Sequence, residues 1–190
     1  MLWMKIHPKS IVFPAILAAS AALTLISIRV NISYASSKTQ FEEPETNISE
    51  IHTSGLSAGF PQEIQHWKSL IEKNALIYNL DPNLVGALIL QESGGHPTIM
   101  SSSGAMGLMQ IMPRDGIAAQ FICINGPCFS QRPTIAELSD PEFNLRFGSQ
   151  MLSGLVNKTG SLREALKLYG PADYGYNYAD IVLALKARYE

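Results

Sequence analysis

The chain has 190 residues, of which 46% are hydrophobic and 16% charged, and its formal net charge at pH 7 is −2. This composition is typical of a globular chain that buries a core, and it excludes the collagen-like and disordered classes. Without a basic surplus we expect no nucleic-acid partner, because nothing would neutralise a phosphate backbone. Two cysteines and four histidines are too few for a disulfide-rich scaffold or a multi-metal site, so we expect no metal and no cofactor.

Residues 1–35 combine a short cationic leader with an uncharged, mostly apolar run over residues 11–28. As a helix this run would be about 27 Å long, close to the hydrocarbon thickness of a bilayer. Ser33-Tyr34-Ala35 follows as a small-x-small cleavage candidate. We therefore predict a signal peptide or a membrane anchor in 1–35. Both alternatives place the rest of the chain outside the cytoplasm, either secreted or anchored in the cell envelope.

Residues 36–61 are rich in Ser, Thr, Glu and Gly, and their few apolar residues form no periodic face. This composition predicts a flexible linker, with a trimmed propiece as the alternative.

From residue 62 onward apolar residues recur at helical spacing, which predicts a compact all-α domain over 62–190. The first helix is expected over 62–78. Asp81-Pro82 supplies an N-cap and a first-turn proline for the second helix, and Gly94-Gly95 ends it.

The C-terminal part of this domain repeats the same start signal. Asp140-Pro141 begins a helix that reaches about residue 158. Ser161 and Glu164 predict a capping box for the next helix, which ends near Tyr169. The last helix is expected over roughly 178–188, and no convincing alternating strand is found.

Glu92 lies on the apolar face of the second predicted helix. It follows Leu88 by four residues and Ile89 by three, so it projects from the stripe that should pack inward. Either the helix end frays and the carboxylate reaches water, or it lies in a partly desolvated cleft. In the cleft its pKa would rise, and a proton would be available near neutral pH, as a general acid for glycosidic cleavage requires. A satisfied structural carboxylate is the alternative.

Small residues follow this carboxylate, and Gly104-Ala105-Met106-Gly107 would let a bulky ligand approach the backbone. The run QESGG from Gln91 and the run SSSGAMGLMQIMP from Ser101 resemble the core motif of the lytic transglycosylases with a goose-lysozyme-like catalytic domain. The run from Asp140 to Asn144 is similar to that family's next helix.

The resemblance implies a lysozyme-like helical fold that cleaves the β-1,4 bond between N-acetylmuramic acid and N-acetylglucosamine in peptidoglycan, whose glycan strands are the expected partner. It implies that Glu92 is the single catalytic acid/base. Ser93 would orient that carboxyl or contact a sugar substituent, and Ser101 matches a loop serine of the binding region, structural rather than catalytic. Three further residues would line the saccharide groove, with an apolar wall and a hydrogen-bonding wall: Leu108, Met109 and Gln110.

The number of carboxylates bears on the mechanism. Ordinary glycosidases need two, and the nearest second one in sequence, Asp115, lies beyond Pro113. A transglycosylase needs one, which protonates the leaving oxygen and then deprotonates the muramic C6 hydroxyl to leave a 1,6-anhydro product. A lysozyme-type hydrolase and a non-catalytic peptidoglycan-binding accessory module are the alternatives.

The chain departs from the family at Leu168-Tyr169-Gly170-Pro171, where a Tyr-Asn-Ala-Gly-Pro-like motif is usual. Tyr169 is a candidate to hydrogen-bond Glu92 or a sugar, with a core aromatic as the alternative. Further along, three tyrosines could form a stacking wall for sugar rings or pack against the last helix: Tyr174, Tyr176 and Tyr178, the last of which is counted among the substrate-binding candidates.

Cys123 and Cys128 enclose four residues that include the turn-forming pair Gly126-Pro127. In an exported protein this favours a disulfide that staples a local loop, and no further zinc ligand stands at suitable spacing. We expect a monomer that contacts a membrane only through a possible N-terminal anchor.

Overall fold

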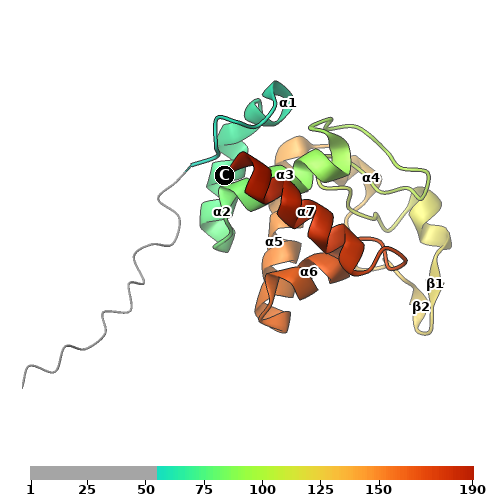
Figure 1. The fold of residues 1–190 in the computed structure, drawn as a ribbon. Coiled ribbons are helices and arrows are strands. Elements are labelled where there is room, and N and C mark those ends of the chain that lie inside the picture. The colour runs from blue at the N-terminus through green and yellow to red at the C-terminus, as the bar shows by residue number, and fades with distance from the viewer. Residues whose placement is uncertain (1–54) are drawn as a thin grey trace, which may run out of the picture. The chain divides into compact units, whose positions relative to one another are not determined.

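Residues 55–190 are described by the structure, a computed structural model, and they form a mainly helical domain (Figure 1). The leader, the apolar run over 11–28, the cleavage candidate and most of the predicted linker lie outside these residues. Within 55–190, no helix combines the length and the apolar character needed to span a bilayer.

The predicted helical pattern is confirmed, and the fold class is all-α. The helices run in the order α1 (Gln62–Gln65), α2 (Lys68–Tyr78), α3 (Pro82–Ser93), α4 (Ile135–Leu138), α5 (Pro141–Thr159), α6 (Leu162–Tyr169) and α7 (Tyr176–Tyr189), with a 3-10 turn η2 (Gly116–Gln120) and a hairpin of β1 (Ile122–Cys123) and β2 (Gly126–Pro127) between α3 and α4. Asp81 and Asp140 cap α3 and α5 as predicted, their carboxylates accepting the N–H groups of Asn83 and Phe143, each at 2.8 Å.

The first predicted helix, 62–78, is broken into α1 and α2 at His66 and Trp67. Trp67 leaves the helical conformation, with φ −95° and ψ 5°. Its indole Nε1 donates to the carbonyl of Gly95, 2.9 Å away, beyond the end of α3. This long-range bond has no local sequence signal, which is why the pattern predicted one helix.

The sequence pattern did not predict two short elements, the hairpin of β1 and β2 and helix α4. The hairpin pairs Ile122 with Pro127 and Cys123 with Gly126, and strands of two residues are too short to show alternation. Helix α4 is a single turn, and it begins with a full capping box between Thr134 and Glu137.

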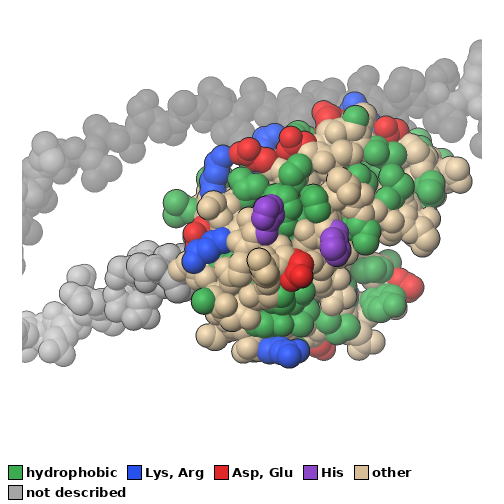
Figure 2. Space-filling view, turned by 90° about the horizontal axis from the view of Figure 1, so that it is seen from above, with side chains coloured by type: hydrophobic (Ala, Val, Ile, Leu, Met, Phe, Trp, Pro, Cys, Tyr) green, Lys and Arg blue, Asp and Glu red, His purple; other side chains and the backbone are tan. Residues whose placement is uncertain are grey.

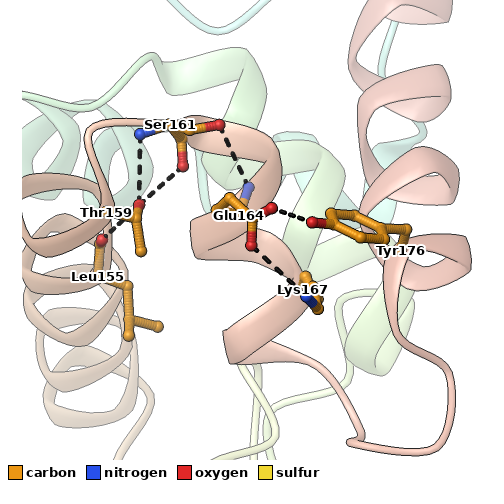
Figure 3. A network of polar contacts seen from close by, with 6 residues as sticks. All are labelled: Leu155, Thr159, Ser161, Glu164, Lys167 and Tyr176. Carbon is orange, nitrogen blue, oxygen red and sulfur yellow. Dashed lines mark hydrogen bonds and ion pairs between the residues drawn. The ribbon is translucent and has the colours of Figure 1, made fainter.

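The capping box predicted for α6 is only half formed, as Figure 3 shows. The hydroxyl of Ser161 accepts the N–H of Glu164 at 3.4 Å, but the Glu164 carboxylate does not return to the backbone of Ser161. It accepts a hydrogen bond from the hydroxyl of Tyr176 on α7 and lies 3.6 Å from Nζ of Lys167. Contacts with α7 therefore take the place of the local cap.

The packed domain begins earlier than the predicted boundary at residue 62. Leu56 and Phe60, inside the predicted linker, are only 3% exposed and belong to the core. The backbone N–H of Leu56 donates to Glu72 at 2.8 Å, and that of Ser57 donates to Asn83 at 2.8 Å. The last residues of the predicted linker are thus part of the fold.

Helix α3 is the central element. Residues 82–89 of this helix are buried without interruption, and it contacts α1, α2 and α7. Helix α5 packs against α2, α4 and α6, and α6 packs in turn against α7 (Figure 1). This arrangement brings the C-terminal end of α3 and the N-terminal end of α7 together.

Candidate active site

The end of α3 presents Glu92 at the edge of the core. The helix stops at Gly94, whose φ of 60° is left-handed, and Gly95 follows with φ 89°. A Cβ at Gly95 would lie 2.7 Å from the carbonyl oxygen of Glu63, so the close approach of α1 requires glycine here. The chain therefore turns away immediately after Glu92 and leaves its carboxyl partly buried.

The electrostatic setting of this carboxyl is that of a partly desolvated group, not of one that a frayed helix end releases into water. Burial raises the pKa of Glu92 to about 7, and a hydrogen bond from the hydroxyl of Tyr178 opposes this rise. Burial and the nearby Glu92 charge both raise the pKa of Tyr178, so the phenol stays a proton donor. Glu92 can therefore hold a proton near neutral pH and release it, which general acid–base catalysis requires.

The glycine-rich segment after α3 folds back on itself. Met106 pairs with Met100 and with Ile111 through isolated antiparallel bridges. The hydroxyl of Ser101 accepts the N–H of Ala105 at 3.0 Å, so this serine has the structural contact that was expected. These bonds make residues 99–111 an ordered loop, called here the motif loop.

Asn144 joins the motif loop to α5. It is fully buried, its Nδ2 donates to the carbonyls of Met106 (2.8 Å) and Leu138 (3.0 Å), and its Oδ1 accepts the N–H of Met109 at 2.9 Å. A Cβ at Gly107 would lie 2.2 Å from this Nδ2, so only glycine leaves room for the amide. Asn144 thus holds the motif loop against the first turn of α5.

Ser93 also supports the motif loop. Its hydroxyl lies 2.8 Å from the carbonyl of Leu108 and accepts the N–H of Gly95 at 3.2 Å, and the side chain is only 6% exposed. These contacts tie the end of α3 to the loop. The structure gives Ser93 this role instead of a contact with the Glu92 carboxyl.

Two predicted groove residues are buried. Leu108 and Met109 are 0% exposed, and a Cβ at Gly148 on α5 would lie 2.4 Å from the Met109 sulfur. The prediction that their side chains line a groove is therefore wrong. Both apolar side chains fill the space between the loop and the helices, where burial stabilises them more than exposure would.

Gln110 has a different position, partly exposed at the end of the motif loop. Its backbone is left-handed, with φ 46°, which is uncommon for a residue with a Cβ. Its Nε2 donates to the carbonyls of Ile99 (3.1 Å) and Gly107 (3.0 Å), and these bonds hold the conformation. The side-chain oxygen is then the group that can accept a hydrogen bond from a ligand.

Tyr169 does not bond Glu92. Its hydroxyl donates to the carbonyl of Met109 at 2.9 Å, and burial together with the Glu92 charge raises its pKa. The contact with Glu92 is made by Tyr178, which is 3% exposed. Helical spacing could have distinguished Tyr178 from Tyr169 as the candidate partner of Glu92. Tyr178 lies four residues before the buried Val182, so both side chains lie on the inward face of the last helix.

The other tyrosines of the C-terminal cluster are not brought to Glu92. The Tyr176 ring has the guanidinium of Arg163 and Nζ of Lys167 each 4.2 Å from its centroid. Its hydroxyl donates to the Glu164 carboxylate (Figure 3). Its ring packs α7 onto α6, which favours the packing alternative over the stacking wall. Tyr174 is 55% exposed in the segment between these helices.

The predicted disulfide between Cys123 and Cys128 is confirmed, and it closes the hairpin of β1 and β2. In the part of the chain that the structure describes, no cluster of three or more His, Cys, Asp or Glu side chains could hold a metal ion.

Figure 2 shows the surface seen from above, relative to Figure 1. Hydrophobic and uncharged atoms predominate on this face, and Lys and Arg side chains are scattered near its edges without forming a continuous basic patch. Such a face offers hydrogen bonding and apolar contact, not long-range attraction of a polyanion.

Comparison with known proteins places this site in a family. The family Transglycosylase SLT domain matches residues 69–175. An endo-type membrane-bound lytic murein transglycosylase A of Klebsiella pneumoniae is 36% identical over 91 residues, which cover 48% of this chain and 43% of the relative. A membrane-bound lytic murein transglycosylase E of Buchnera aphidicola is 35% identical over 100 residues, covering 53% and 44% of the two chains.

Among solved structures, an inactive mutant of the lytic transglycosylase Slt from Pseudomonas aeruginosa has a similar fold, with a TM-score of 0.53 and 20% identity over 68% of this chain and 24% of that one. The matched segment spans less than half the length of the curated relatives. Since the family match covers more than half of the chain and includes Glu92, the motif loop and Tyr169, the chain belongs to the Transglycosylase SLT domain family.

Proposed function

We propose that this protein is a peptidoglycan lytic transglycosylase that cleaves the β-1,4 bond between N-acetylmuramic acid and N-acetylglucosamine. The observation that carries the proposal is a single partly buried carboxyl, Glu92, whose pKa is raised to about 7 and which accepts a hydrogen bond from Tyr178. The names of the relatives support the substrate, since they are lytic murein transglycosylases.

The reaction needs one proton carrier. Protonated Glu92 gives its proton to the glycosidic oxygen as the C1–O4 bond breaks, and the oxygen of the substrate's own N-acetyl group stabilises the anomeric carbon. The Glu92 carboxylate then takes the proton of the muramic C6 hydroxyl while O6 bonds to C1. The product is a 1,6-anhydro sugar, no water is consumed, and Glu92 regains its proton.

Among the described residues, no second carboxylate is among the groups that shift the Glu92 pKa, which supports this outcome over hydrolysis. Retaining and inverting glycosidases place two carboxyl groups about 5–10 Å apart. Asp115, the nearest candidate in sequence, instead accepts the N–H of Ile135 at the start of α4, at 2.8 Å. Across residues 55–190, the causes of the raised Glu92 pKa are burial and Tyr178, without a second carboxylate.

Substrate binding is assigned to groups that the site leaves accessible. The side-chain oxygen of Gln110 can accept an N-acetyl N–H group, because its Nε2 is already bonded within the loop. Tyr169 and Ser101 shape the site by holding backbone groups of the motif loop. The relatives' description as membrane-bound supports a location in the cell envelope, and we propose that the protein acts there as a monomer.

The test is digestion of purified peptidoglycan by the full chain, with mass analysis of the products. Wild type should release muropeptides lighter by one water than hydrolytic products, and Glu92→Gln should release none. Glu142→Gln, which changes an exposed carboxylate paired with Lys73, is the matched control and should keep activity. Products with reducing ends would identify a hydrolase, and binding without turnover by the wild type would identify an accessory module.

A further inference from the structure

Arg132 lies between the hairpin and α4, with its guanidinium against α5. The guanidinium carbon is 5.9 Å from the centroid of the Phe147 ring, and Nη1 contacts the sulfur of Met151. Its backbone N–H donates to the carbonyl of Phe129 at 2.8 Å. The side chain is therefore held by packed neighbours on a helix, and its position is defined.

No carboxylate among the residues that the structure describes forms an ion pair with Arg132. Within residues 55–190, the other basic side chains either form an ion pair with a carboxylate or are exposed, whereas Arg132 is partly buried and forms no ion pair. Burial lowers its pKa, as expected for a cation that has lost water without gaining an anion. A ligand anion here would supply the missing partner.

This unpaired cation is close to the candidate active site. Phe147 and Met151, which it contacts on α5, flank Gly148, and a Cβ at Gly148 would lie 2.4 Å from the sulfur of Met109 in the motif loop. The carbonyl of Met109 accepts the hydroxyl of Tyr169, and the charges of Glu92 and Arg132 act on the pKa of this phenol in opposite directions. An anion bound at Arg132 would therefore belong to a substrate that reaches the motif loop.

We infer that Arg132 binds a carboxylate on the lactyl-peptide arm of the muramic acid residue, which makes it a specificity-determining residue. The inference rests on the proposed function for the identity of the glycan. A chain of N-acetylglucosamine carries no carboxylate, whereas the muramic substituent carries one on its lactyl group when free, or on its peptide when substituted. A guanidinium binds a carboxylate through two parallel hydrogen bonds, which suits this assignment.

The experiment measures binding to the full chain carrying Glu92→Gln, so that turnover does not interfere. Three ligands of equal sugar length are compared: a peptide-bearing muramyl oligosaccharide, its peptide-free form with a free lactyl carboxylate, and an N-acetylglucosamine oligomer. Adding Arg132→Gln should weaken binding of one or both muramyl ligands about tenfold and leave the N-acetylglucosamine oligomer unchanged. The muramyl ligand whose affinity falls shows whether Arg132 binds the peptide carboxylate or the lactyl carboxylate.

Two further variants sharpen the result. Arg146→Gln removes an exposed arginine of α5 that lies over Phe143, and it should leave all three affinities unchanged. Arg132→Lys keeps the charge but not the two-pronged geometry and should retain part of the preference. Equal weakening of all three ligands by Arg132→Gln, no weakening, or no binding of the muramyl ligands would overturn the inference. A wild type that cleaves nothing, while the preference persists, would instead contradict the proposed function.

Discussion

The hydroxyl of Tyr178 donates a hydrogen bond to Oε1 of Glu92 and so connects the first turn of α7 to the last turn of α3, 86 positions apart in the chain. Burial favours the protonated carboxyl, and this hydrogen bond favours the ionised one. The balance leaves the pKa at about 7, where one group can act first as an acid and then as a base.

Tyr178→Phe should change the pH dependence of activity. In wild type, kcat/KM should fall as pH rises through about 7, because Glu92 then loses the proton that the leaving oxygen needs. Removing the hydroxyl removes the bond that stabilises the carboxylate, so the pKa rises and the alkaline limb moves to higher pH. We also expect kcat at the optimum to drop about tenfold, since the carboxyl is no longer oriented. The pH–rate profile on soluble glycan measures both effects.

Tyr174→Phe is the control for this experiment, because Tyr174 is exposed and has no contact with Glu92. Its profile should match that of wild type. If the alkaline limb of the pH–rate profile stays in place or moves to lower pH in Tyr178→Phe, the role assigned to the hydrogen bond between Tyr178 and Glu92 is contradicted.

Glu92→Gln should stabilise the protein at alkaline pH. The folded pKa of Glu92 is about 7 against an ordinary 4.5, so the folded state binds the proton more tightly than the unfolded state. Stability is therefore greatest below pH 4.5 and falls as pH rises from 4.5 through 7. At pH 8 a neutral glutamine avoids this loss in the free energy of unfolding. The loss is up to about 3 kcal/mol, because each pKa unit corresponds to about 1.4 kcal/mol.

Urea unfolding at pH 8 and at pH 4.5 measures this difference. The gain from Glu92→Gln should be present at pH 8 and nearly vanish at pH 4.5, while Glu142→Gln should change little at either pH, because its exposed pair contributes little. A variant less stable than wild type at pH 8 would show that the ionised carboxylate is satisfied by its surroundings.

Asn144→Ala should destabilise the domain by about 3 kcal/mol or more. The change leaves two carbonyls and the N–H of Met109 without partners inside the core, and each such group costs about 1–3 kcal/mol. Asn157→Ala, at an exposed position of the same helix, is the matched control. If both variants lose the same small amount in urea unfolding, the amide does not hold the motif loop.

Cys123→Ser should loosen the hairpin and leave the helical core intact. In the chain-entropy model, closing so short a loop contributes about 2 kcal/mol, which here acts on the local opening of the hairpin and not on global unfolding. The hairpin residues Ile122 and Ile124 are 70% and 102% exposed, so little of the core depends on them. We expect faster proteolytic cleavage near residues 121–129, read by mass spectrometry, with nearly the same melting temperature. A large fall in melting temperature would show that the disulfide stabilises the whole domain.

Local patterns predicted the framework of the domain and drew attention to Glu92. The helix starts at Asp81 and Asp140 and the stop at Gly94 depend on neighbours in the chain, so they can be read from sequence. Periodicity singled out Glu92, because a carboxylate on an apolar stripe breaks the pattern, whereas its role as an acid was implied by the resemblance to the lytic transglycosylases. The disulfide followed from the close spacing of the only two cysteines.

Tertiary packing decided which residues contact Glu92. The sequence offers both Tyr169 and Tyr178 as candidate tyrosines of the site. Tyr169 bonds Met109, whereas Tyr178 bonds Glu92, because α7 packs against α3. Met109 was expected at the surface and is fully buried, since its sulfur fills the space above Gly148. Helix periodicity tells which face of a helix points inward, but which side chain it meets there depends on how distant helices pack.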